Sequence, residues 1–211
     1  MSAHTLTNAN ANANAALEWD VAAAPIPGEE VLGDRAVVAF TDEHVLAAAV
    51  DGLGHGTEAA AAADVAARML EQSAEQDPAA LTLACHQALL HTRGAALSVA
   101  SINLREHTMT WVGVGNVEGR LVRGAKPRPV TESLLLHAGI VGHELPPLSA
   151  QSVRIGRGDV LIFATDGIRR DFADLLVPSG SCRQIAERVL QQHAVGSDDA
   201  LVLVARYLAS R

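Results

Sequence analysis

The stretch LAAAVDGLGHGTEAA, residues 46–60, joins an apolar run to an alanine-rich run through a turn that contains three glycines. The first run predicts a buried strand that ends at Asp51, and the second predicts a helix with Thr57 as its N-cap. Glycine permits positive φ angles and close approach of the backbone, which a sharp turn requires. The stretch therefore predicts a strand, a tight turn and a helix, with a carboxylate at the strand tip beside His55.

Asp51-Gly52 by itself also fits an ordinary turn, because Asp and Gly favour turns for local reasons. Three further aspartates lie at similar edges of apolar runs: Asp34 precedes one, Asp166 follows one, and Asp198 precedes the last. Hard divalent cations bind carboxylate, carbonyl and water oxygens. Four strand-edge carboxylates on one chain therefore suggest a site for two cations.

The remaining apolar runs predict several strands and helices, and none of them repeats. Strands are expected at 17–24, 35–41, 45–50, 95–104, 108–114, 117–123, 160–165 and 200–208. Helices are expected at 57–76, from Pro78 to just before Arg93, at 168–176 and at 181–193. Residues 124–150 carry few strand signals. Hairpins combined with paired helices predict a layered α+β architecture.

The length of 211 residues suits one domain, expected at 17–211, after a polar Asn/Ala-rich tail at 1–16 that is expected to be disordered. A net charge of −8 argues against a nucleic-acid-binding surface. No apolar run is long enough to span a membrane, and the N-terminus lacks a signal sequence, so a cytoplasmic monomer is expected. Cys85 and Cys182 lack metal-ligand spacing and are expected to be reduced, packed thiols.

Five short motifs, taken in order, resemble a known family over about residues 17–208. They are Gly33-Asp34, Asp51-Gly52-Leu53-Gly54-His55-Gly56, Gly113-Val114-Gly115-Asn116-Val117-Glu118, Thr165-Asp166-Gly167 and Asp198-Asp199. The chain resembles the PPM (PP2C-like) metal-dependent protein serine/threonine phosphatases. It is most similar to the SpoIIE-type branch, and within it to the small stressosome phosphatases of the RsbX type. The stretch from Gly113 to Gly119 fits a glycine-rich turn equally well.

The resemblance implies a PP2C-like layered sandwich of two mainly antiparallel β-sheets flanked by α-helices, with the metal site at one end. It implies two divalent cations, Mn²⁺ or Mg²⁺, and a metal-bridging hydroxide that attacks phosphorus directly. Asp51 would bridge both cations and the Gly52 carbonyl would bind one of them. Asp34, Asp166 and Asp198 would complete the metal ligands. Asp199 would contact these ligands without binding a metal itself.

The chain departs from larger members of the family at two positions. Those enzymes have a histidine directly after the first Asp-Gly, where this chain has Leu53; the histidine here is His55. Two interpretations of His55 stay open: a catalytic acid or phosphate contact, and a histidine that caps the turn. The upstream phosphate-binding arginine of the larger enzymes has no match, and Glu29 lies near its place.

The resemblance implies that the substrate is a phosphorylated STAS-domain protein of the RsbS/RsbR type in a bacterial stress-response complex. An alternative substrate is an anti-anti-sigma factor, as for RsbU and SpoIIE. A catalytically inactive binding module of the same fold is a further alternative. A nucleotide-binding loop is disfavoured, because the glycines of residues 52–56 lack the spacing and the lysine of a P-loop.

Overall fold

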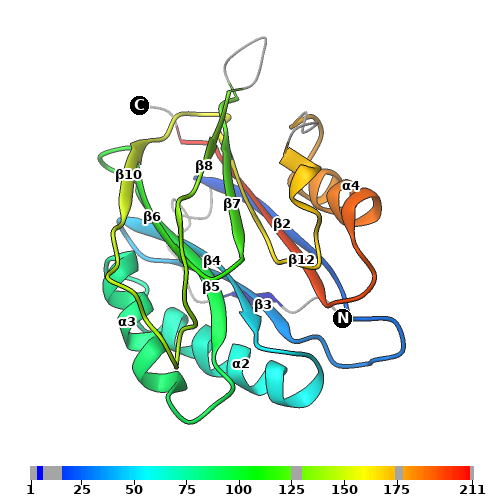
Figure 1. Ribbon diagram of the computed structural model, residues 1–211. Helices are drawn as coiled ribbons and strands as arrows, with labels where there is room; N and C mark the ends of the chain where they lie inside the picture. Colours follow the sequence, from blue (N-terminus) through cyan, green and yellow to red (C-terminus); the bar gives the residue numbers. More distant parts are fainter. Residues whose placement is uncertain (1–3, 7–15, 125–129, 174–177, 210–211) are drawn as a thin grey trace.

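Two β-sheets form the centre of the protein, and helices cover their outer faces (Figure 1). The computed structural model describes residues 4–6, 16–124, 130–173 and 178–209. Within these residues only two strand pairings are parallel, β1 with β3 and β6 with β9, and the others are antiparallel. The expected α+β sandwich of two mainly antiparallel sheets is confirmed.

The strands are distributed between the two sheets as follows. The first sheet contains β1 (His4–Leu6), β3 (Asp34–Phe40), β4 (His44–Gly52), β5 (Ala95–Asn103), β6 (Thr108–Val114) and β10 (Gln151–Arg154) in that order, with β9 (Leu136–His137) paired to β6. The second sheet contains β2 (Leu17–Ala24), β12 (Ala200–Tyr207), β11 (Val160–Ala164), β7 (Glu118–Val122) and β8 (Thr131–Ser133) in that order.

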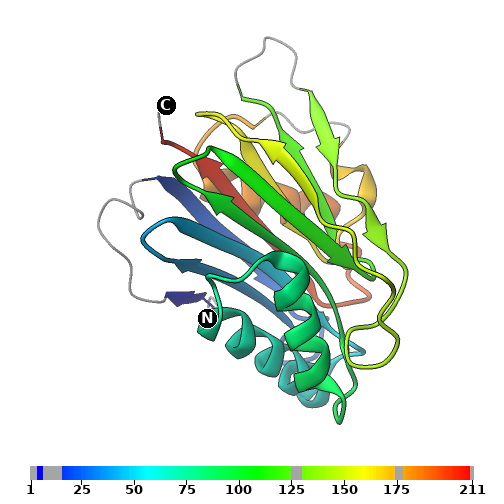
Figure 2. The same cartoon turned by 90° about the vertical axis from the view of Figure 1, so that its left-hand side faces the viewer.

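The helices pack on the two outer faces. Helices α2 (Gly56–Gln72) and α3 (Pro78–Leu89) cover the first sheet, which Figure 2 shows from the side of these helices. Helix α4 (Cys182–His193) and the short 3₁₀ helix η1 (Arg170–Ala173) cover the second sheet. None of the described helices has the length and apolar character that crossing a membrane requires.

Strand β4 shows why the central strands are continuously apolar. Its alternate residues Val45, Ala47 and Ala49 face the core between the sheets. The residues between them, such as Leu46 and Val50, face the core beneath α2 and α3. Both faces of the strand are therefore buried, and no polar alternation is possible. Alanine dominates the buried face of α2, which allows that helix to lie close to the sheet.

The two cysteines lie in these outer cores, as expected. Cys85 packs beneath α2 and α3, and Cys182 packs beneath α4. Both are free and buried. Burial raises the pKa of each thiol to about 12, so both stay protonated near neutral pH. The prediction of reduced, packed thiols is confirmed.

Side chains cap two of the helices, whereas the predicted cap of α2 is wrong. Asp77 accepts hydrogen bonds from Ala79 N and Ala80 N at 2.7 and 3.2 Å and so caps α3, and Ser181 caps α4. Thr57, however, is not the N-cap of α2: that position belongs to His55, because the glycine turn leads directly into the helix. Helix α2 also ends at Gln72 and not at residue 76.

Other differences concern short edge strands. β8 and β9 lie in the region 124–150 that carried few strand signals, and β10 follows it. Residues 1–16 were expected to be disordered, yet His4–Leu6 pair with β3, whose free edge offers unpaired backbone groups. Residues 1–3 and 7–15 of that tail, and 174–177 of the expected helix at 168–176, lie outside the described residues.

Candidate metal centre

The turn after β4 is built so closely that Gly52 has no room for a side chain. A Cβ atom at Gly52 would lie 2.1 Å from the carbonyl oxygen of Ala59 in α2. The Gly52 amide donates to the Gly33 carbonyl at 3.3 Å, and the Leu53 amide donates to the Gly94 carbonyl at 3.0 Å. The turn that follows Asp51 is therefore fixed from three sides.

Asp34 and Asp51 lie directly opposite each other on neighbouring antiparallel strands. The side chain of Asp34 is buried, and one of its carboxylate oxygens accepts a hydrogen bond from Thr165 Oγ1 at 2.8 Å. Thr165 directly follows β11 of the second sheet. This bond therefore links the first sheet to the second at the end where both expected ligands lie.

Replacing Thr165 by Val is expected to lower the free energy of unfolding by about 1–3 kcal/mol, because the variant leaves a buried carboxylate without its donor. Thr165 Oγ1 also accepts from Leu201 N at 2.9 Å, so a second buried group loses its partner. Denaturant unfolding of the chelator-treated protein measures the change. Thr110→Val, which removes an exposed hydroxyl bonded to Ser152, is the matched control; equal stability of the two variants would contradict the interpretation.

Asp166 comes to the same place from the end of the second sheet. One of its oxygens accepts from Asn116 Nδ2 at 2.6 Å. Asn116 lies in the turn between β6 and β7, so the glycine-rich stretch around it is a turn that also reaches the site. The oxygen of the same amide, Asn116 Oδ1, is buried and lacks a hydrogen-bond partner among the described residues. Such an orphaned acceptor suits a cation or an ordered water.

Asp198 and Asp199 precede β12 and differ in their partners. Asp199 is buried, and its two oxygens accept from Ile26 N at 2.8 Å and from Gly33 N at 2.7 Å. It therefore holds the loop that leads into Asp34. Asp198 Oδ1 accepts from the Asp199 amide at 2.9 Å. The structure thus gives Asp199 backbone partners on both oxygens and leaves Asp198 with a free oxygen in the described structure.

Burial and mutual repulsion raise the pKa values of these aspartates. The pKa of Asp51 rises to about 9, first because of burial and then because of the charges of Asp34, Asp166, Asp198 and Asp199. Burial is also the largest cause that raises the pKa of Asp34 to about 7, against the lowering effect of the Thr165 hydrogen bond. Burial and Asp198 raise the pKa of Asp166. A set of crowded acids that resists ionisation is stabilised by added positive charge.

The donor set fits a hard divalent cation. All the groups named are oxygens, with no thiolate or imidazole among them, which favours Mg²⁺ or Mn²⁺ over Zn²⁺. Across the described residues, no three acidic, His or Cys side chains enclose a single point tightly enough to hold an ion by themselves. Water would therefore complete the coordination, as is usual for Mg²⁺. Asp34, Asp51, Asp166 and Asp198, with the Gly52 carbonyl, are the residues that could hold such ions.

His55 lies in the glycine turn and occupies the N-cap position of α2 with its backbone only. Its side chain makes no capping hydrogen bond to α2, so the structure does not show the imidazole capping this helix. Instead its Nδ1 lies 2.5 Å from Glu29 Oε1, and 61% of the side chain is exposed. Glu29, noted in the sequence only for its position, is thus the partner of His55.

Sequence reasoning missed three contacts that shape the site. Thr165 and Asn116 were quoted as motif residues without a role, and each binds one of the aspartates. Arg93 was noted only as the end of a helix, and it lies over Gly54 of the glycine turn. A donor next to an acidic strand end is a weak signal for the first two. No local signal marks Arg93.

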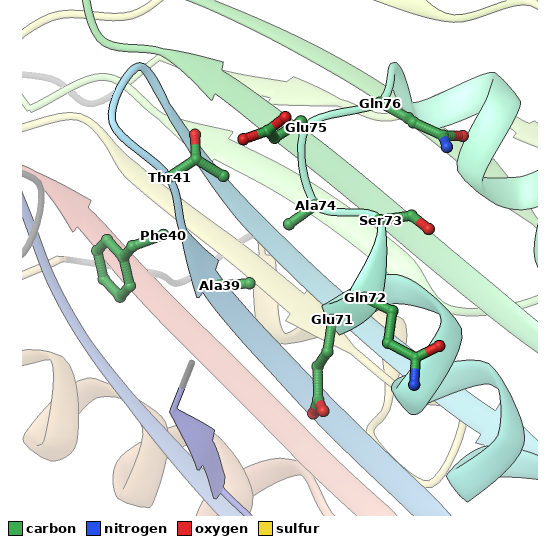
Figure 3. Close-up of a pocket in the computed structure, with 9 residues that line it drawn as sticks. All are labelled: Ala39, Phe40, Thr41, Glu71, Gln72, Ser73, Ala74, Glu75 and Gln76. Atoms are coloured by element: carbon green, nitrogen blue, oxygen red, sulfur yellow. The ribbon is translucent and has the colours of Figure 1, made fainter. Parts of the chain in front are cut away.

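A cavity elsewhere on the surface does not belong to this site. It lies between the end of β3, at Ala39–Thr41, and residues 71–76 at the end of α2 (Figure 3). Asp34 starts β3 and Phe40 ends it, so the cavity lies about 20 Å along the strand from the aspartates. Its lining includes Glu71 and Glu75 but no basic side chain, so it offers nothing to an anionic substrate.

Comparison with protein families gives a match over most of the chain. The family model of Stage II sporulation protein E (SpoIIE) matches residues 41–208. The phosphoserine phosphatase RsbX of Bacillus subtilis (strain 168) is 25% identical over 182 residues, which cover 85% of this chain and 89% of that protein. The matched region includes four of the five aspartates; Asp34 lies just before the family match.

Solved structures share the fold. A chain from a study of the bacterial stressosome, as a modular system adapted to control secondary messenger signalling, has a TM-score of 0.82 at 26% identity, covering 90% of this chain and 99% of that chain. RsbX in complex with magnesium has a TM-score of 0.81 at 22% identity, covering 91% and 96%. The PP2C phosphatase domain of SpoIIE from Bacillus subtilis has a TM-score of 0.72 at 20% identity, covering 92% and 64%.

Proposed function

The chain belongs to the SpoIIE family and is a PPM-type protein phosphatase similar to RsbX, and on this premise we propose that it removes phosphate from phosphoserine or phosphothreonine of STAS-domain regulators in a bacterial stress-response complex. The observation that carries the proposal is the convergence of Asp34, Asp51 and Asp166 from three strand ends in two sheets. The likeness to a phosphoserine phosphatase and to a stressosome chain over nearly the whole length supports the substrate class.

PP2C-like phosphatases use divalent metals, and the oxygen donors of this chain fit them. We propose that Asp51 and the Gly52 carbonyl hold two cations together with Asp34, Asp166 and Asp198. Bound there, the cations would supply an activated water and neutralise the phosphoryl oxygens. Thr165 orients Asp34, Asn116 orients Asp166, and Asp199 fixes the loop before Asp34. These contacts keep the carboxylates in place before substrate binds.

We propose His55 as the group that donates a proton to the leaving serine oxygen or contacts the phosphate. Glu29 is hydrogen-bonded to Nδ1 of His55, so Nε2 is the nitrogen that could face a substrate. The exposure of the imidazole, four residues after Asp51, supports this role.

Phosphate release tests the proposal. We expect turnover of p-nitrophenyl phosphate and of a phosphorylated STAS protein with Mn²⁺ or Mg²⁺, none with chelator, and at least a hundredfold loss in Asp166→Ala. Asp42→Ala, in the exposed turn between β3 and β4, is the matched control and should retain full activity.

The substrates used in this assay separate the alternatives. If the protein prefers a phosphorylated anti-anti-sigma factor over a stressosome STAS protein, the proposed substrate is wrong, but the proposed phosphatase activity holds. No release from any substrate by the folded, metal-loaded wild type would overturn the enzymatic proposal and favour a binding module.

A further inference from the structure

A hollow of about 410 Å³ lies beside the glycine turn. Its lining comes from the loop before β3 (residues 29–31), from His55 to Glu58 at the start of α2, and from Arg93. Arg93 is the one permanently charged cation in this lining, which also contains three glutamates. Of these, Glu58 pairs with Arg93 and Glu29 pairs with His55. An arginine in an otherwise acidic wall calls for an explanation in terms of what it binds.

Hydrogen bonds fix the backbone around Arg93 to the glycine turn and to His143. The Gly94 carbonyl accepts from the Leu53 amide at 3.0 Å, two residues after Asp51. The Arg93 carbonyl is bonded to His143 Nε2 at 3.0 Å. Gly94 has a φ of 79°, and a Cβ there would lie 2.8 Å from the Val141 carbonyl, so the segment cannot shift freely. The base of the Arg93 side chain is thus held at a constant place beside the turn.

The guanidinium of Arg93 lies over the turn, and its ion-pair partner is a single exposed carboxylate. Its Nη1 would be 2.9 Å from a Cβ at Gly54, so it covers a stretch of bare backbone. Its Nη2 pairs with Glu58, and the two side chains are 51% and 67% exposed. Exposed ion pairs contribute little to stability, so exchanging this partner for a stronger anion costs little free energy.

We propose that Arg93 binds the phosphoryl group of the substrate, leaving Glu58 when the substrate enters; this inference rests on the proposed phosphatase function. A phosphate monoester dianion carries more charge than a carboxylate and accepts two parallel hydrogen bonds from the guanidinium fork. Glu58 holds Arg93 over the turn in the free protein and is displaced by the stronger ligand. Arg93 is thus a substrate-binding residue that orients the phosphoryl group toward the aspartates.

Calorimetric titration of inorganic phosphate into the Mg²⁺-loaded protein tests the proposal without any turnover, and KM for p-nitrophenyl phosphate tests it kinetically. Arg93→Ala should weaken phosphate binding and raise KM by about tenfold or more. Arg93→Lys should recover only part of this, because an ammonium cannot form the fork. Glu58→Gln should tighten phosphate binding about threefold, because Arg93 loses its competing partner.

Arg105→Ala is the matched control, because Arg105 also forms an exposed ion pair, with Glu43, in the turns far from the aspartates. It should bind phosphate like the wild type. If Arg93→Ala also behaves like the wild type in both measurements, the assignment of Arg93 is overturned. If phosphate binding depends on Arg93 but the wild type releases no phosphate from any substrate, the assignment of Arg93 stands and the proposed enzymatic function fails.

Discussion

Replacing Asp51 by Asn should abolish metal-dependent phosphate release and, at the same time, stabilise the metal-free protein near neutral pH. Asparagine keeps the shape of the side chain but removes the charge that would hold two cations. Loss of one preorganised charged group in a catalytic site costs about a hundredfold to a thousandfold, and we expect a loss at or beyond the upper figure. Phosphate release with Mn²⁺ or Mg²⁺ measures it.

The opposite effect on stability follows from the direction of the pKa shift. The pKa of Asp51 rises from 3.8 to about 9 in the folded, metal-free protein. Across that interval the folded protein holds a proton that the unfolded chain has lost. The free energy of unfolding therefore falls as the pH rises through this interval. Asparagine cannot lose a proton, so the variant should lack this part of the decline.

Denaturant unfolding in chelator at about pH 5, 7 and 9 checks the stability effect. The wild type should lose stability toward the alkaline end, and Asp51→Asn should lose less and be more stable at neutral pH. Glu106→Gln, which removes an exposed carboxylate in the turn between β5 and β6, should follow the wild type in both stability and activity. If Asp51→Asn were less stable than the wild type at every pH, the aspartates would not repel one another as the structure indicates.

Much of the fold was predictable because its signals are local. Strands such as β4 and β12 are buried on both faces, so their sequences are nearly continuous apolar runs that end at polar residues. The aspartates at those ends could be named for the same reason. Asp77 and Ser181 satisfied the first amides of their helices, which sequence alone can indicate.

What could not be predicted depends on contacts between distant segments. The bond from Thr165 to Asp34 spans 131 residues, and the bond from Gly33 to Asp199 spans 166. Neither leaves a periodic trace in the sequence. Strand β10 was missed because only alternate residues of a short, half-exposed strand are informative. The start of α2 was misplaced because a tertiary contact, and not a side-chain cap, fixes the chain there.

Arg93 illustrates the same limit at the site itself. It follows α3 and precedes β5, and nothing in its immediate sequence connects it with Asp51. The connection is a backbone hydrogen bond between Gly94 and Leu53. A residue that serves a site through its neighbour's backbone is invisible to motif reasoning, and only the folded chain reveals it.

Replacing Gly52 by Ala should destabilise the protein by about 3 kcal/mol or more, at or above the upper end of typical overpacking costs. The added Cβ would lie 2.1 Å from the Ala59 carbonyl oxygen and 2.7 Å from its carbonyl carbon. These atoms belong to the backbone of α2, which cannot rotate away as a side chain would. Relief requires α2 to move from the first sheet or the turn to leave its place, and either movement displaces Asp51.

Gly156→Ala is the control for this prediction, because its nearest neighbour would be Asp159 Oδ2 at 3.9 Å, an ordinary contact. Its free energy of unfolding should stay within about 0.5 kcal/mol of the wild type. Denaturant unfolding compares the two variants, and phosphate release should fall only in Gly52→Ala. Equal stability of the two would show that α2 does not press against the turn, and the placement of Asp51 by that contact would then be wrong.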